Sequence, residues 1–132
     1  MPRRSLAKAG HSSLFLNGST TRAKNELSVR PENARAAYLG GTCLAAVGER
    51  EQAREWAARA LAIDPDDVMT QYNVACTYSQ LGDLDQAFDL LERLIPNAGQ
   101  EMKRGWLQHD SDLDPLRSHP RYQKILKILD AG

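Results

Sequence analysis

The sequence predicts an all-α protein, built as a right-handed superhelix of antiparallel helix hairpins with a capping helix at its C-terminal end. The first observation is an internal repeat, because an offset of 34 residues brings Tyr38 onto Tyr72 and Gly48 onto Gly82. The second is that apolar or small side chains recur at helical spacing within each copy. Repetition at this period is typical of a solenoid, in which neighbouring units bury one continuous core.

A basic arm, residues 1–18, precedes the repeats. The whole chain has no net charge, yet its first thirty residues hold six basic residues and one acid, Glu26, so the remainder is acidic. The apolar cluster Leu14-Phe15-Leu16 is too short for the hydrophobic region of a secretory signal. Two interpretations stay open: a loose solvated terminus, or a segment with the composition of an organellar transit peptide.

The remaining residues, 19–132, are predicted to form one repeat domain. Its parts are a half repeat at 19–33, full repeats at 34–67 and 68–101, and a partial repeat with a capping helix at 102–132. No stretch reaches 18 uninterrupted apolar residues, so we expect no transmembrane helix. Two cysteines in 132 residues make no disulfide framework and suit a reducing compartment, and we expect a cytoplasmic protein.

Each full repeat is predicted to hold two helices. In the first, Ala34–Val47 stops before Gly48, a residue suited to the left-handed end of a helix, and the second helix covers about Glu51–Ile63. The run Asp64-Pro65-Asp66-Asp67 then ends that helix and offers caps for the next. The second repeat follows the same plan. Its helices are predicted at Val68–Leu81 and Leu84–Ile95, the latter ending near Pro96.

Small residues stand where the helices of a pair must approach. Gly41 and Ala75 share one place in the first helix of each unit, and Ala53 and Ala87 share one in the second. A small side chain lets two helix axes approach to the lower end of the usual spacing. Each Gly of the pair Gly40-Gly41 costs about 1 kcal/mol inside a helix relative to Ala, so close packing must offset that loss.

The C-terminal segment departs from the repeat pattern after Gln108. A helix over Pro120–Leu129 places Tyr122 and Ile125 among the side chains available for packing. We expect this helix to cap the solenoid by folding over its last groove. The alternative is that it pairs with a second chain, and a homodimer through an exposed solenoid end stays open.

A family resemblance rests on positions in each full copy that match one repeat pattern, several of which agree between the two copies. In the second copy they are Tyr72, Ala75, Tyr78, Gly82 and Ala87; in the first they are Tyr38, Gly41, Gly48, Ala53, Ala60, Leu61 and Pro65. This pattern, over about residues 20–108, resembles the tetratricopeptide repeat, a helix hairpin of 34 residues. The chain departs from the family where a bulky first aromatic is usual, since Ala37 and Gln71 stand there.

The tail carries a second resemblance, over residues 110–117 and 119–122. It is similar to the C-terminal tails of bacterial multidomain proteins that join a nucleotide cyclase or a protein kinase to such repeats. That resemblance implies an alternative function, in which the chain is a regulatory tail or a relative of one. A lesser alternative is nucleic-acid binding through the basic arm.

Catalytic and metal-binding chemistry is not expected. Asp110, Asp112 and Asp114 alternate like the start of a calcium loop, but Pro115 and Arg121 stand where such a loop needs Gly and Glu. The three histidines have no zinc spacing, and no glycine loop for phosphate is present. We therefore expect no cofactor, no metal and no enzyme activity.

The groove of the solenoid is the predicted binding site. The resemblance implies that the second, fifth and ninth places of each unit point inward; these are Arg35, Tyr38, Thr42, Met69, Tyr72, Cys76, Lys103, Trp106 and Asp110. Aromatic side chains and Met bury much area with few rotors, which suits a peptide site, and the two cations suit an acidic segment. The expected function is therefore non-catalytic protein–protein interaction, with a peptide or helix in the groove. The alternative is that these aromatics are ordinary packing, solvated or covered by the capping helix.

Overall fold

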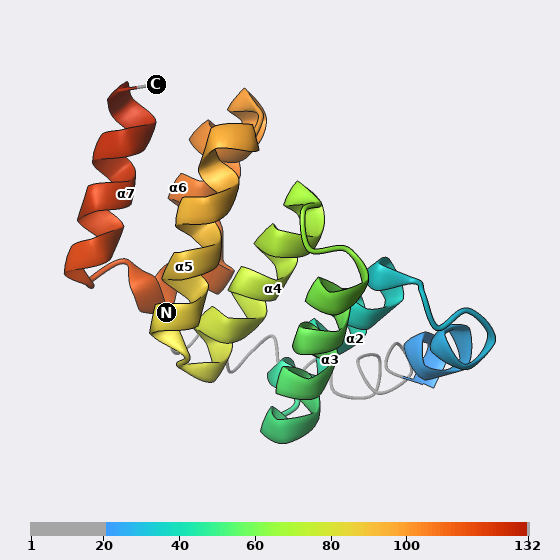
Figure 1. Ribbon diagram of the computed structural model, residues 1–132. Helices are drawn as coiled ribbons and strands as arrows, with labels where there is room; N and C mark the ends of the chain where they lie inside the picture. Colours follow the sequence, from blue (N-terminus) through green and yellow to red (C-terminus); the bar gives the residue numbers. More distant parts are fainter. Residues whose placement is uncertain (1–20, 132) are drawn as a thin grey trace.

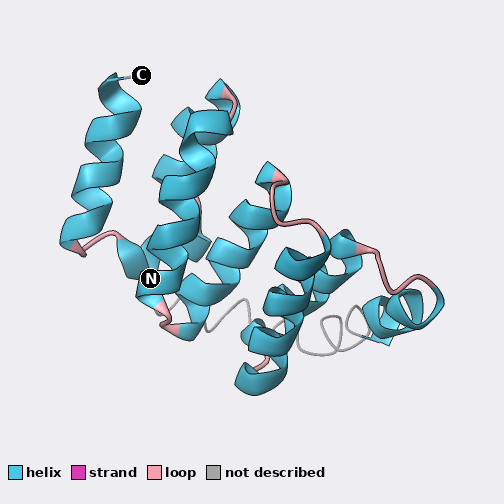
Figure 2. Ribbon diagram, viewed as in Figure 1, coloured by secondary structure: helices cyan, strands magenta, loops and turns pink. Residues whose placement is uncertain are grey.

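The computed structural model describes residues 21–131, and this part of the chain is helical without strands (Figures 1 and 2). Its elements are a helix at residues 21–29, α2 (Ala34–Ala46), α3 (Arg50–Ile63), α4 (Val68–Leu81), α5 (Leu84–Leu94), the 3-10 turn η1 (Ile95–Asn97), the π-helical η2 (Met102–Trp106), α6 (Leu107–His109), the 3-10 segment η3 (Ser111–Leu116) and α7 (Pro120–Ala131). The all-α prediction is confirmed. No helix among the described residues has the length and apolarity to cross a membrane.

The turns of the two full repeats follow from single residues. Gly48 and Gly82 have φ angles of 88° and 81°, in the left-handed region where a side chain is strained, and each follows the first helix of its unit. Asp67 caps α4, because its carboxylate accepts a hydrogen bond from the Thr70 backbone N–H at 2.9 Å. The predicted boundaries hold to within a residue or two, with α5 ending at Leu94 and a 3-10 turn continuing from it.

The hairpins stack side by side in chain order, from the helix at residues 21–29 to α7 (Figure 1). The first helices pair directly, since α2 packs against α4 as well as against its own partner α3. A hydrogen bond of 3.1 Å between the Thr42 and Thr77 hydroxyls joins α2 to α4. The chain is therefore a tetratricopeptide-like helical repeat. Its first helices, which pack against one another, start 34 residues apart in the sequence.

Gly40 has the tightest packing of the glycines in α2. A Cβ atom there would lie 2.0 Å from Cζ3 of Trp56, whose ring occupies that space, whereas one on Gly41 would meet Ala53 and Trp56 at an ordinary 3.5 Å. The close packing that the glycine pair requires is thus present at Gly40. The large side chain that fills the space between α2 and α3 is therefore Trp56, on the second helix of the hairpin. Ala37, on the first helix, is fully buried but has only a small side chain.

The last unit keeps the period but breaks its first helix. One period after α4 (Val68–Leu81) lie η2, α6 and η3, and α7 ends two periods after the end of α3. The helix stops at Asp110, whose backbone is extended and whose Oδ1 accepts from the Asp112 N–H at 2.9 Å to start η3. Pro115 lies in η3, where a continuous α-helix would lose a hydrogen bond. The predicted departure after Gln108 is therefore a change in helix geometry, and the spacing of elements continues.

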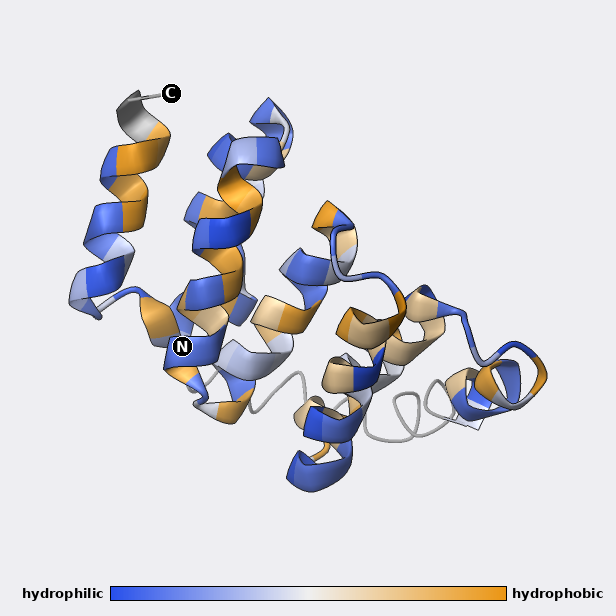
Figure 3. Cartoon of the chain, in the orientation of Figure 1, coloured by the Kyte–Doolittle hydropathy of each residue, from blue (hydrophilic) through white to orange (hydrophobic). Residues whose placement is uncertain are grey.

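α7 packs beside α5 rather than over the groove, which corrects the expected position of the capping helix. Its Arg121 pairs with Asp89 and Glu92 of α5, each at 2.9 Å. The His119 ring lies 4.8 Å from that of Phe88. In Figure 3 apolar residues alternate with polar ones along both α5 and α7, as expected for helices that bury one face each.

The segment that packs against the C-terminal part of α4, about one period later in the chain, is η3. It packs against α4, where the Ser79 hydroxyl donates to the Asp112 backbone carbonyl at 2.8 Å. The Gln80 amide donates to Asp112 Oδ1, also at 2.8 Å. Leu113 and Leu116 of η3 are completely buried. A short 3-10 segment thus closes the C-terminal end of the stack of first helices.

Candidate functional site

An aromatic centre lies where the first helices of the second and third units meet. Tyr72 of α4 and Trp106 of η2 have ring centroids 5.4 Å apart and an interplanar angle of 46°, a tilted geometry that aromatic pairs favour. The Tyr72 hydroxyl donates to Asp110 Oδ2 at 2.5 Å. Burial raises the pKa of that hydroxyl well above its usual range, and Cys76 and Asp110 raise it further. Tyr72 is therefore a neutral donor that joins α4 to the break in the last unit.

The π-helical geometry of η2 places Trp106 at this centre. π turns inside α-helices are uncommon and occur frequently at functional sites. Here the turn spans Met102–Trp106; Lys103 is its second residue and Trp106 its last, and both are half-buried. Trp106 thus has one face on Tyr72 while part of its surface remains accessible. Sequence periodicity places Trp106 one period after Tyr72 but carries no signal for the π turn.

The other predicted groove residues differ widely in exposure. Tyr38 and Cys76 are buried, at 8% and 3% exposure, and Thr42 is half-buried with its hydroxyl bonded to Thr77. Met69 is 39% exposed and Arg35 is exposed. The structure pairs two of the three rings in the predicted ladder, those of Tyr72 and Trp106; Tyr38 lies on α2, one period earlier. The exposed and half-exposed members are therefore the predicted groove residues whose side chains are accessible.

Three potential metal ligands meet beside this centre. One ligand atom from each of Cys76, Asp110 and Asp112 lies within 4.8 Å of the others. The carboxylates are already used as hydrogen-bond acceptors, because Asp110 accepts from the Tyr72 hydroxyl and the Asp112 N–H, and Asp112 accepts from the Gln80 amide. These bonds give the acidic residues a structural role, in which they cap η3 and fasten it to α4.

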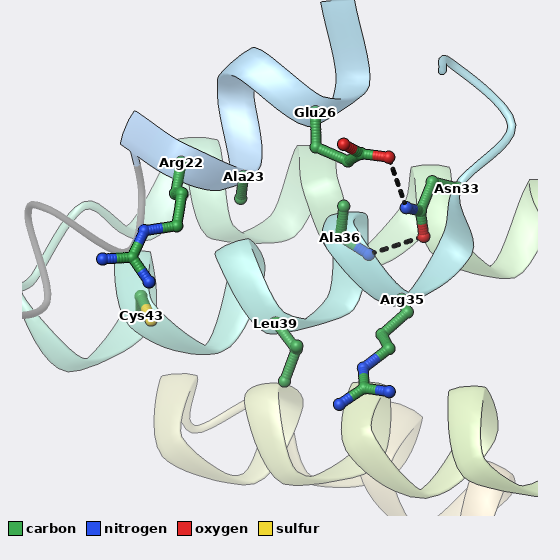
Figure 4. Close-up of a pocket in the computed structure, with 8 residues that line it drawn as sticks. All are labelled: Arg22, Ala23, Glu26, Asn33, Arg35, Ala36, Leu39 and Cys43. Carbon is green, nitrogen blue, oxygen red and sulfur yellow. Dashed lines mark hydrogen bonds between the residues drawn. The ribbon is translucent and has the colours of Figure 1, made fainter. Parts of the chain in front are cut away.

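A pocket of about 390 Å³ lies at the other end of the described stack (Figure 4). It opens between the helix at residues 21–29 and α2, and its lining includes Arg22, Ala23, Glu26, Arg35, Leu39 and Cys43. Figure 4 shows Arg22 reaching towards Cys43 on one side and Glu26 meeting Asn33 on the other. The Asn33 amide donates to Glu26 at 3.1 Å, and its side-chain oxygen accepts from the Ala36 N–H at 3.1 Å.

Apart from Arg35, the lining of this pocket was not predicted from the sequence. The groove positions implied by the family resemblance all lie on first helices, and so they do not include residues 22–26 of the preceding second helix. The repeat nevertheless contains a sequence signal that indicates this pocket. Arg22 stands one period before Trp56, so a charged residue replaces the ring that fills the following hairpin.

Comparison with known proteins agrees with the repeat assignment. A family model described as a tetratricopeptide repeat matches residues 56–89, which run from Trp56 in α3 to Asp89 in α5. The chain is also 30% identical over 86 residues to a chloroplastic protein of Arabidopsis thaliana. That match covers 63% of this chain and 25% of the plant protein, so the chain spans about a quarter of the length of that relative.

These findings support a tetratricopeptide family and indicate a protein-interaction module, since repeats of this family are generally non-catalytic and bind other proteins. The second resemblance, to bacterial cyclase and kinase tails, is not confirmed and stays a prediction. The basic arm at residues 1–18 lies outside the described residues, and so its role also stays a prediction.

Proposed function

We propose that this chain binds a peptide or helical segment of another protein in the groove formed by its first helices. The observation that carries the proposal is the pair of Tyr72 and Trp106, in which a buried ring supports a half-exposed one. An aromatic side chain held in one orientation loses little conformational entropy on binding, which is the property of an interface hot spot.

Charge and exposure define the segment that this groove suits. Met69 is 39% exposed and offers an adaptable apolar contact one turn from Tyr72. Arg35 and Lys103 stand in the first and third units, on either side of it along the stack. The proposed ligand therefore has an apolar residue for Met69 and Trp106, and acidic residues towards the two cations.

The alternative proposal is a regulatory tail of a bacterial cyclase or kinase. In that case the same groove binds a segment of the catalytic protein, so the two proposals differ in the partner's identity. Sequencing the genomic neighbourhood and the transcript separates them. A cyclase or kinase domain encoded with this chain supports the alternative, and its absence from both removes it.

Affinity capture from the source lysate, followed by mass spectrometry and a binding titration of the captured partner, tests the groove. We expect Trp106→Ala and Met69→Glu each to weaken binding at least tenfold, because both side chains are accessible in the groove. Ile128→Ser is the matched control, since Ile128 is 50% exposed on α7 and lies outside the groove. Binding that survives both groove variants, or that fails equally in the control, contradicts the proposal.

A further inference from the structure

The pocket at the start of the described stack corresponds, by the repeat, to the space that a first helix fills later in the stack. In the stack, α4 turns Thr77 towards α2, as its hydrogen bond with Thr42 shows. The residue one period before Thr77 is Cys43, which lines the pocket. α2 therefore presents to the pocket the same helix face that α4 presents to α2.

The opposite wall of the pocket repeats this relation for second helices. α3 covers α2 with Trp56, whose ring fills the space above Gly40, and with Ala57, whose backbone nitrogen would lie 3.6 Å from a Cβ atom on Gly41. One period earlier the helix at residues 21–29 carries Arg22 and Ala23, and both line the pocket. The two walls are thus the surfaces that enclose a first helix in the later units.

We propose that this pocket is a docking seat for an amphipathic, acidic helix of another protein, which takes the place of a first helix ahead of α2. This site shares Arg35 with the groove of the proposed function, but it does not depend on that function. The incoming helix lies against Leu39, which is 44% exposed, and against Ala23 and Ala36. It therefore needs an apolar stripe of small and aliphatic side chains.

The positive charge of this docking seat favours an acidic helix as its ligand. Arg22 and Arg35 are both exposed, and neither forms an ion pair with another residue in the range 21–131. Glu26 is engaged by Arg30 and Asn33, so its charge is partly compensated within the chain. Carboxylates on the incoming helix gain two guanidinium partners. The chain's own residues 1–18 contain basic residues and no acid, which is the wrong charge for this seat.

The repeat also predicts which residue of the incoming helix should carry a carboxylate. Because Arg22 is the counterpart of Trp56, and Trp56 covers Gly40, the residue that stands at the Gly40 place of the incoming helix faces Arg22. A probe follows directly: a fluorescein-labelled peptide of residues 34–47, held helical by a side-chain link, with Gly40→Glu and with Cys43→Ser to prevent oxidation. The matched control peptide is identical except for Gly40→Lys.

Fluorescence anisotropy titrations of both peptides against the full chain test the seat. We expect the Glu peptide to bind at least about tenfold more tightly than the Lys peptide, and its affinity to fall with added salt. The variant Arg22→Glu reverses the preference, and the variant Leu39→Ser weakens both peptides. Circular dichroism of each variant confirms that the helices are retained.

Three results overturn the proposal. They are equal binding of the two peptides, binding of neither peptide, and an unchanged preference in Arg22→Glu. A fourth result overturns it by assigning the seat to this chain itself: displacement of the Glu peptide by a synthetic peptide of residues 1–18. None of these measurements uses Met69 or Trp106, so failure here is distinguishable from failure of the groove.

Discussion

Replacing Gly40 by Ala tests the packing of the first hairpin at a single atom. The added Cβ would lie 2.0 Å from Cζ3 and 2.3 Å from Cε3 of Trp56, whereas carbon atoms pack at about 3.5–4.0 Å. The indole ring must therefore move by about 1.5 Å or more inside a buried site. Overpacking of this kind costs roughly 1–3 kcal/mol, against a gain of about 1 kcal/mol from replacing Gly within a helix. The difference leaves an expected net loss of up to about 2 kcal/mol in the free energy of unfolding.

The neighbouring residue provides the matched control. A Cβ on Gly41 meets its nearest atoms at 3.5 Å, an ordinary contact, so Gly41→Ala keeps the gain in helix propensity, up to about 1 kcal/mol, without the clash. Urea unfolding followed by circular dichroism at 222 nm measures both variants, and it is insensitive to the change in tryptophan environment. The two adjacent substitutions have the same chemistry and are expected to differ in sign.

A double-mutant cycle assigns the effect of Gly40→Ala to the indole ring. With Trp56→Leu in the background, Gly40→Ala loses most of its cost, and the coupling free energy is about 1 kcal/mol or more. If Gly40→Ala stabilises the protein as much as Gly41→Ala does, or if the coupling is zero, then the ring does not fill this space and the packing described for the hairpin is wrong.

Three further predictions concern stability. Ala87→Trp, at a fully buried position between paired helices, should lower the free energy of unfolding by about 1–3 kcal/mol or more in a urea titration, and an unchanged midpoint would argue against the repeat frame. Burial is the main cause that raises the pKa of all four tyrosines above 10. Because their hydroxyls therefore ionise first in the unfolded chain, the free energy of unfolding should fall as pH rises above about 10. Tyr72→Phe should weaken this pH dependence, and a stability profile that stays flat to pH 11 would contradict it. Asp110→Ala removes the acceptor for two hydrogen bonds and should speed amide exchange in η3 while leaving α2 unchanged, whereas uniform exchange would refute its local role.

The elements of the two full repeats could be predicted from the sequence because each boundary depends on a local signal. Gly48 and Gly82 end first helices through their own backbone conformation, and Asp67 caps α4 through a bond three residues away. The pairing of α2 with α4 followed from the period, since equal spacing places equivalent helices side by side. These features require no knowledge of side-chain packing.

The positions that the sequence did not reveal depend on contacts between distant residues. Trp56 lies outside the positions compared between repeats, and only the structure shows that its ring makes Gly40 obligatory. α7 contacts α5 through Arg121, whose acidic partners lie about thirty residues earlier in the chain. A helix that presents apolar residues on one face does not specify which surface it will cover.

The candidate site was anticipated in part. Periodicity placed Tyr72 and Trp106 in one column, and the structure brings their rings together. It could not show that Asp110 bonds Tyr72 and turns the chain into η3, because that requires a helix to end within the expected first helix of the unit. The pocket beside Arg22 was missed because its walls come from two units, of which only the second is a full repeat.

The central claim is that the 34-residue period stacks the first helices directly on one another. Nuclear Overhauser spectroscopy of the methyl-labelled protein tests it most directly, through the Thr42 and Thr77 side chains, whose hydroxyl oxygens lie 3.1 Å apart. A cross-peak between the Thr42 and Thr77 methyl groups is expected, together with one from the Trp56 ring to the Gly40 α-protons. The absence of both, or a cross-peak that joins α2 to another helix at these places, would contradict the stacking.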